Sequence, residues 1–171
     1  DNLAGISLRE KYRLRWYNSN FNSLAKFELK KRINRLNYKK FFKFDYSKEF
    51  PQNFSNKNFA DICQNKLFEW NYRYTFELFP KIQIQYNREY YEDNKKVRLT
   101  IDKRIKFWKS LDDKQMFYGH PLDYDLNIAE IKFSPELYNY VSILLNQTRF
   151  IPKRHSKYLV GLALFDEVKY F

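Results

Sequence analysis

The 171-residue chain contains very little cysteine and glycine. Its single cysteine, Cys63, excludes a disulfide framework, a thiolate metal site and a CxxC redox pair. With only three glycines, a glycine loop that cradles phosphate is not expected, and no GxxxxGK[ST], GxGxxG, HExxH or GxSxG motif is present. Any phosphate group that this protein binds must therefore be held by side chains.

Long apolar runs are missing as well. No stretch approaches the roughly 20 apolar residues that a membrane-spanning helix needs, and the first residues contain no apolar signal-peptide core. Together with the lone cysteine, this predicts a cytoplasmic protein. The length predicts one domain over residues 1–171.

The charge is strongly positive and unevenly distributed. Lysine and arginine number 32 against 20 acidic residues, a formal net charge of +12, which favours an anionic partner. Residues 1–50 carry a net charge of +8 and residues 81–110 a net charge of +5, whereas the remainder is close to neutral. Both basic blocks have the residue pattern of β-strands.

The first basic block, LREKYRLRWYN, alternates with a period of two. Cations occupy every second position from Arg9 to Arg15, and most positions between them are apolar or aromatic. This alternation predicts a strand with one cationic face and one face packed into a core. Residues 25–44 predict further strand structure, with Glu28, Lys30 and Arg32 on one face.

The pattern becomes helical over residues 55–78, where Ser55 or Asn58 is a candidate N-cap and Pro80 ends the helix. Residues 81–108 then predict a hairpin of two strands with a charged loop at 92–96.

Residues 128–133 predict another short strand, and Ser134 followed by Pro135 is typical of a helix start. The C-terminal segment, residues 153–171, is compatible with a strand or with a helix. The chain is thus expected to contain antiparallel β-structure with two inserted helices.

Cations on one face of several strands favour a sheet that closes around them. On an open sheet they would simply be solvated, but inside a barrel they need anionic partners. A water-filled tunnel that binds a polyanion meets this need, because guanidinium groups bind phosphate oxygens bidentately. Glu28 and Glu130, which stand among the cations, either neutralise their neighbours or hold a divalent metal.

Six short motifs in this order resemble the VTC (vacuolar transporter chaperone) polyphosphate-polymerase domain of the triphosphate tunnel metalloenzyme, or CYTH-like, superfamily. They are YRLRWYN, FELKKR, IQYNREYY, VRLTID, AEIKF and HSKY. They correspond to the family pattern RxRxY, ExK, YxR, RxTxD, ExK and SKY, and together they span nearly the whole chain. The resemblance implies an α+β fold: an antiparallel β-barrel tunnel with inserted helices. The family has a further strand upstream of RxRxY, which we expect this chain to lack.

The resemblance also implies a function. The tunnel would bind ATP and polyphosphate and transfer the ATP γ-phosphate to a growing polyphosphate chain, with Glu130 holding Mn²⁺ or Mg²⁺. Arg98 and Lys132 would be catalytic residues, and a further tunnel lysine would be Lys39 or Lys40. The phosphate-binding residues would be Arg13, Arg15, Lys30, Lys39, Arg88, Arg98, Lys132 and Lys157.

Two alternatives share these residues. A hydrolase of the same superfamily would cleave tri- or polyphosphate, or a nucleotide triphosphate, with the same cations and metal. A non-catalytic module would bind a polyanion or nucleic acid, but Tyr12 and Trp16 lie on the parity opposite the arginines, so they are not expected to stack on bases. We therefore expect no nucleic-acid partner. Membrane-complex or regulatory subunits outside this chain, at the cytosolic face of a membrane, are compatible with the resemblance.

Overall fold

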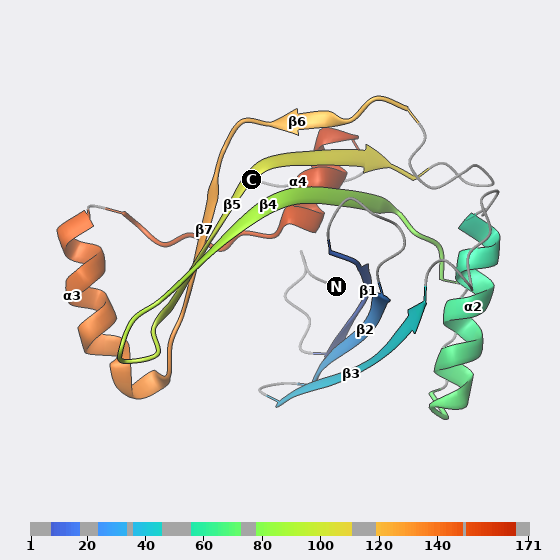
Figure 1. Ribbon diagram of the computed structural model, residues 1–171, viewed down its shortest axis with the longest axis horizontal. Helices are drawn as coiled ribbons and strands as arrows, with labels where there is room; N and C mark the ends of the chain where they lie inside the picture. Colours follow the sequence, from blue (N-terminus) through green and yellow to red (C-terminus); the bar gives the residue numbers. More distant parts are fainter. Residues whose placement is uncertain are drawn as a thin grey trace. The chain divides into compact units, whose positions relative to one another are not determined.

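The computed structural model describes residues 8–17, 24–33, 36–45, 56–72, 78–110, 119–148 and 150–166 (Figure 1). The chain divides into two units. Unit 1 comprises Asp1–Pro80 with Leu111–Met116, and unit 2 comprises Lys81–Ser110 with Phe117–Phe171. Each unit is described by itself, and the single domain expected over residues 1–171 stays a prediction.

Unit 1 contains an antiparallel sheet of three strands in the order β1-β2-β3. These strands are β1 (Leu8–Arg15), β2 (Leu24–Ile33) and β3 (Leu36–Asp45). The predicted first strand is confirmed, and residues 25–44 form two strands, because Ile33 pairs with Leu36 and the chain returns antiparallel.

Helix α2 (Asn56–Glu69) packs against one face of this sheet. The buried side chains of Ala25, Phe27 and Leu29 in β2 meet those of Cys63 and Leu67 in the helix. Successive β2 residues point to opposite faces, so the three apolar residues share one face while the residues between them share the other. The apolar half of the predicted alternation thus forms the core.

One cation, Lys31, lies on the core-facing side of β2 and is neutralised there. Its Nζ lies 3.0 Å from Oε1 of Glu10 and 3.2 Å from the hydroxyl of Tyr72. Tyr12 donates a hydrogen bond of 2.6 Å to the same carboxylate, and Tyr72 donates another. A charge at the edge of the core is tolerated because it is paired and hydrogen-bonded.

The predicted helix over residues 55–78 is shorter than expected, since α2 ends at Glu69. Asn71 follows with a φ of 55°, in the left-handed region that asparagine adopts more readily than most residues and that often terminates helices. The chain therefore leaves the helix well before Pro80. Asn58 lies within α2 and is not its cap, and Ser55 lies outside the described residues.

Unit 2 is built around the long strand β5 (Arg98–Lys109), which pairs antiparallel with β4 (Ile82–Glu92) as the predicted hairpin. Along its other edge, β5 pairs with β7 (Ile128–Lys132), a predicted strand, and with β6 (Leu122–Tyr124), which the sequence did not indicate. The α+β class with antiparallel sheets is confirmed. The described strands form two sheets and no closed barrel, so the tunnel stays a prediction.

A β-bulge changes the parity of β5. The register shifts between Gln85 and Asn87, and Arg104 on the opposite strand has a φ of 51°. Ile84 and Arg88 lie on the same face of β4, and they pair with Phe107 and Asp102 on β5. Phe107 and Asp102 therefore share that face, although one has an odd number and the other an even number. One face of unit 2 therefore carries apolar residues at one end and charged residues at the other.

The helices of unit 2 are α3 (Tyr138–Thr148), preceded by the short 3₁₀ helix η1 (Pro135–Leu137), and α4 (Lys157–Leu164). The predicted start is confirmed, with Ser134 as the N-cap residue and Pro135 at the first position. Within the C-terminal segment, Lys157–Leu164 form the helix α4, and Gly161 lets this helix approach the sheet at Ile82 and Phe107.

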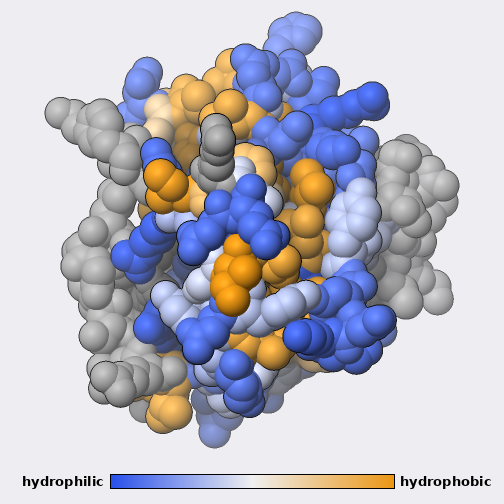
Figure 2. All heavy atoms as spheres, turned by 90° about the vertical axis from the view of Figure 1, so that its left-hand side faces the viewer, coloured by the Kyte–Doolittle hydropathy of each residue, from blue (hydrophilic) through white to orange (hydrophobic). Residues whose placement is uncertain are grey.

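Helix α3 exposes apolar side chains, and the face drawn in Figure 2 shows hydrophobic residues among hydrophilic ones. Tyr138 is 65% exposed and Ile143 is 59% exposed. None of the helices within the described ranges is both long enough and apolar enough to cross a membrane.

Candidate functional site

The face of the unit 1 sheet opposite α2 is strongly cationic. We call it the unit 1 face. The register aligns its residues in rows across the three strands, and a single acidic side chain, Glu28, stands in the described part of these rows. The described side chains of this face are Lys11, Arg13, Arg15, Lys26, Glu28, Lys30, Arg32, Asn37, Lys39, Phe41 and Lys43.

Glu28 is the centre of the first cluster of charges. Its side chain is only 3% exposed, and Arg13 contacts its Oε2 through Nη2 at 2.5 Å and Nε at 3.1 Å. The ammonium groups of Lys39 and Lys26 lie 3.2 Å and 3.9 Å from Oε1. Burial alone would raise the pKa of Glu28, but the hydrogen bond and charge of Arg13, with smaller contributions from Arg15 and Lys39, lower the pKa below its usual value.

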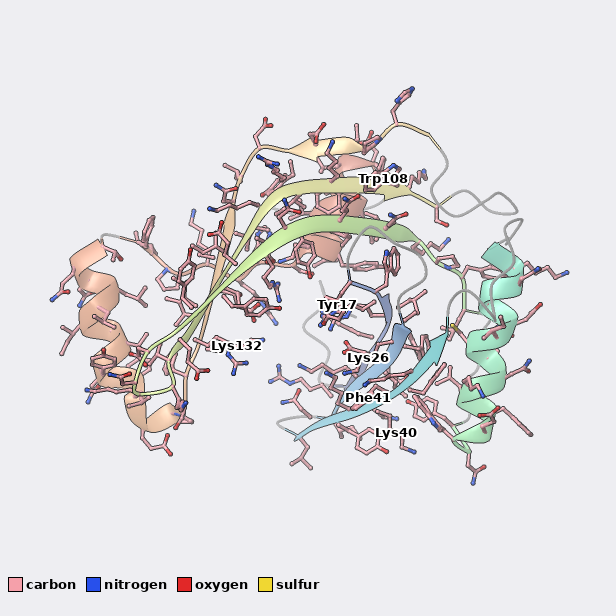
Figure 3. The ribbon with its side chains drawn as sticks, viewed as in Figure 1. Tyr17, Lys26, Lys40, Phe41, Trp108 and Lys132 are labelled. Atoms are coloured by element: carbon pink, nitrogen blue, oxygen red, sulfur yellow. The ribbon has the colours of Figure 1, made fainter. Side chains whose placement is uncertain are left out.

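The two adjacent lysines of β3 point to opposite faces. Lys39 pairs across the sheet with Lys30 and contacts Glu28, so it belongs to the unit 1 face. Lys40 is on the α2 side, where its Nζ lies 5.8 Å from the ring centres of Tyr38 and Trp70 (Figure 3). The sequence did not decide whether Lys39 or Lys40 is the further tunnel lysine. Lys39 is the one that shares the unit 1 face with Arg13.

A second buried carboxylate organises the charged face of unit 2. The side chain of Asp102 is 2% exposed. Arg88 binds its carboxylate bidentately, at 2.5 Å from Nε to Oδ1 and 2.7 Å from Nη2 to Oδ2. Lys157, the first residue of α4, places Nζ 2.5 Å from Oδ2. Burial tends to raise the pKa of Asp102, but hydrogen bonds from Arg88 and Lys157 outweigh it and lower the pKa.

The remaining predicted residues lie further along the same face, which we call the unit 2 face. Arg98 on β5 pairs directly with Lys132 on β7, and both side chains are more than half exposed. Each has a nearby carboxylate: Glu92 is 3.1 Å from Arg98, and Glu130 is 3.2 Å from Lys132. These ion pairs are exposed to water, so they hold the cations only weakly.

Glu130, the predicted metal ligand, is 46% exposed and pairs across the strands with Thr100. The Thr100 hydroxyl is buried and has no hydrogen-bond partner in the described part of the chain. Those same residues include no group of three or more His, Cys, Asp or Glu side chains that could hold a metal by themselves. A cation bound here would need further oxygen ligands from a phosphate, as is usual for Mg²⁺.

All nine predicted site residues thus fall on two faces. Arg13, Arg15, Lys30 and Lys39 lie on the unit 1 face, and Arg88, Arg98, Glu130, Lys132 and Lys157 lie on the unit 2 face. Six further residues of the unit 1 face were not singled out from the sequence as site residues, namely Lys11, Lys26, Arg32, Asn37, Phe41 and Lys43. They follow the same alternation of side chains along each strand, but only the pairing of β2 with β3 shows that the residues of the two strands lie on the same face.

The architecture is that of an antiparallel α+β protein whose strands present cations around buried carboxylates. The chain belongs to the VTC family, because the sequence model of the VTC domain matches residues 1–166. The VTC domain is associated with polyphosphate polymerase function. Comparisons with curated proteins and with solved structures found no match.

Proposed function

We propose that this protein binds ATP and polyphosphate in a basic tunnel and transfers the ATP γ-phosphate to a growing polyphosphate chain, with Mn²⁺ or Mg²⁺. One observation carries the proposal: the residues that match the short VTC motifs share two strand faces, each organised around one buried carboxylate. The closed tunnel is part of the proposal. It would surround the phosphates with the cations of these strands.

Phosphoryl transfer of this kind requires positioning and charge neutralisation, and no protein nucleophile. A terminal oxygen of the polyphosphate chain would form a bond to the γ-phosphorus of ATP. The bond from that phosphorus to the β,γ-bridging oxygen would break, and ADP would leave with the electron pair.

Arg98 and Lys132 are suited to stabilise this transfer. They lie directly opposite each other on β5 and β7, and their exposed ends leave room for a phosphate group. Arg88 and Lys157 are mostly buried, at 18% exposed each, and are held in place by Asp102. They would therefore act as rigid phosphate contacts, whereas Arg98 and Lys132 can move with the substrate.

In this proposal, a divalent cation would bind beside Glu130. The Glu130 carboxylate and the unpartnered hydroxyl of Thr100 stand on paired residues and offer the hard oxygen ligands that Mg²⁺ and Mn²⁺ prefer. When bound, the cation would neutralise charge on the phosphate oxygens.

The test is to incubate the protein with ATP and Mn²⁺ and to follow ADP release and polyphosphate length on a gel. The proposal predicts chains that lengthen with time, and a loss of most of this activity in Arg98→Ala. The matched control is Lys57→Ala, which removes an exposed lysine from α2 and should keep full activity.

The outcomes separate the candidate functions. Release of inorganic phosphate without chain growth would assign the protein to the hydrolases of the superfamily. Neither chain growth nor phosphate release would reject an enzymatic role for this chain.

A further inference from the structure

The unit 1 face continues beyond the Glu28 cluster. Next to the row that contains Arg13 and Glu28 is a row of three lysines, because Lys11 pairs with Lys30 and Lys30 pairs with Lys39. Like charges directly opposite each other destabilise an antiparallel sheet. Of these lysines, Lys39 contacts Glu28, whereas Lys30 forms no ion pair with a carboxylate in the described part of the chain.

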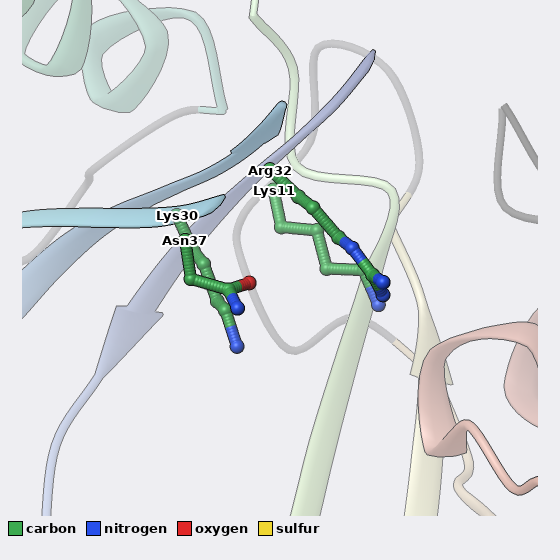
Figure 4. A pocket seen from close by; sticks show the side chains of 4 residues that line it. All are labelled: Lys11, Lys30, Arg32 and Asn37. Atoms are coloured by element: carbon green, nitrogen blue, oxygen red, sulfur yellow. The ribbon is translucent and has the colours of Figure 1, made fainter. Parts of the chain in front are cut away.

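A small pocket opens at this lysine row, on the side away from Glu28. Its lining residues are Lys11, Lys30, Arg32 and Asn37, and none of the four is acidic. In the view of Figure 4, the side chains of Lys11 and Arg32 extend from the sheet in the same direction. Asn37 on β3 pairs with Arg32 on β2, and in the same view its side chain extends in the same direction as that of Lys30.

The chemistry of the lining favours a phosphate chain. Two ammonium groups and one guanidinium group supply three positive charges, and the Asn37 side chain adds an amide that can donate a hydrogen bond. Side chains of like charge are held together at little cost when a ligand with several negative charges lies between them. None of the four residues is aromatic, so the pocket offers no ring on which a nucleobase could stack.

We propose that Lys11, Lys30, Arg32 and Asn37 form a second phosphate subsite, which binds a segment of polyphosphate beyond the segment held around Arg13 and Glu28. The inference rests on the proposed function. It adds that the protein distinguishes long phosphate chains from short ones, because only a long chain occupies both parts of the unit 1 face. Lys11, Arg32 and Asn37 thereby become residues that determine chain-length preference.

The test is a comparison of two ligands by titration calorimetry on the full chain. Tripolyphosphate is the short ligand, and a long-chain polyphosphate of defined length is the long one. The double variant Lys11→Ala, Arg32→Ala is expected to bind the long chain about tenfold more weakly than the unmodified protein, a loss of about 1.4 kcal/mol. Its affinity for tripolyphosphate is expected to change little, since the residues around Glu28 are intact.

The matched control is the double variant Lys57→Ala, Lys81→Ala. It removes the same number of exposed cations outside the unit 1 face and should preserve the preference for the long chain. The variant Lys11→Gln, Arg32→Gln, which keeps the side chains long and polar, replaces the alanine variant if the latter is unfolded by circular dichroism.

Three results would overturn the inference in distinguishable ways. Equal losses for both ligands, or a loss for neither, would reject the second subsite and leave the proposed function standing. Failure of the unmodified protein to bind either ligand would reject the proposed function together with the subsite.

Discussion

Replacing Asp102 by asparagine removes the negative charge that Arg88 and Lys157 share. The substitution keeps the size of the side chain but leaves two cations, each 18% exposed, beside a neutral amide in a site where the carboxylate was 2% exposed. Removing one partner of a buried ion pair typically costs about 3–5 kcal/mol. Because Arg88 and Lys157 retain some contact with water, we expect the lower end, about 3 kcal/mol.

A loss of this size is easily measured as a change in the melting temperature. For a chain of 171 residues, 1 kcal/mol corresponds to roughly 2–4 °C, so Asp102→Asn should lower Tm by about 6–12 °C at neutral pH. The matched control is Asp123→Asn, because Asp123 is 65% exposed and pairs with Lys106 at the surface at 3.4 Å. Its effect on stability should stay within about 0.5 kcal/mol.

The difference between the unmodified protein and Asp102→Asn should depend on pH. The pKa of Asp102 is lower in the folded protein than in the unfolded chain, so its ion pairs stabilise the fold above the unfolded pKa of about 3.9. That stabilisation is lost as the pH falls through the lowered folded pKa. The gap in Tm between the two proteins should therefore narrow below about pH 4.

Tripolyphosphate should partly restore the variant. With Asp102 neutralised, the phosphate is the remaining anion available to Arg88 and Lys157, so the ligand should raise the Tm of the variant by more than that of the unmodified protein. An unchanged Tm in Asp102→Asn would refute the role of the ion pairs in stability. An equal or smaller gain with ligand would refute the role of Arg88 and Lys157 as phosphate contacts.

Three further predictions concern single residues. Lys39→Ala should weaken tripolyphosphate binding about tenfold in calorimetry, whereas Lys40→Ala, on the opposite side of β3, should not; equal effects would contradict the assignment of the two faces. Gly161→Ala should lower the free energy of unfolding by about 1–3 kcal/mol in a urea titration, since its Cβ would overlap Ile82; no change would mean that α4 does not pack closely. Because the pKa of Glu28 is lowered, Glu28→Gln should cost about 1–2 kcal/mol at pH 7, after allowance for its partly exposed partners, and little below about pH 4; a cost that persists in acid would point to packing as its cause.

The cationic face of unit 1 could be predicted from sequence because strand side chains alternate with a strict period of two. Arg13 and Arg15 must share a face wherever β1 lies in the fold, and the apolar residues between them must face the core. The same reasoning places Arg98 and Asp102 together on β5.

Other features depend on pairing that the sequence does not encode locally. Lys39 and Lys40 are identical side chains in adjacent positions, and only the register of β3 against β2 assigns Lys39 to the cationic face. The bulge at Arg104 could not be predicted from a glycine, because none is present there. The bulge nevertheless brings Phe107 and Asp102 onto one face of the sheet.

The local sequence pattern does not predict where α2 ends, because apolar residues at helical spacing continue past Glu69. Trp70, Tyr72 and Leu78 instead pack on the core outside the helix, where tertiary contacts override the helical pattern.

The central claim is that the cationic strand faces bind a phosphate chain, and the most direct measurement is a competition titration on the full chain at fixed salt concentration. Tripolyphosphate and a single-stranded oligonucleotide compete for the protein, and their affinities are compared per phosphate group. The account predicts tighter binding of tripolyphosphate, because the aromatic rings of Tyr12, Phe27 and Trp70 face the core. Phe41, the aromatic residue among the described side chains of the unit 1 face, is contacted by Lys26, whose Nζ lies 3.8 Å from the centre of its ring. Tighter binding of the oligonucleotide would contradict it.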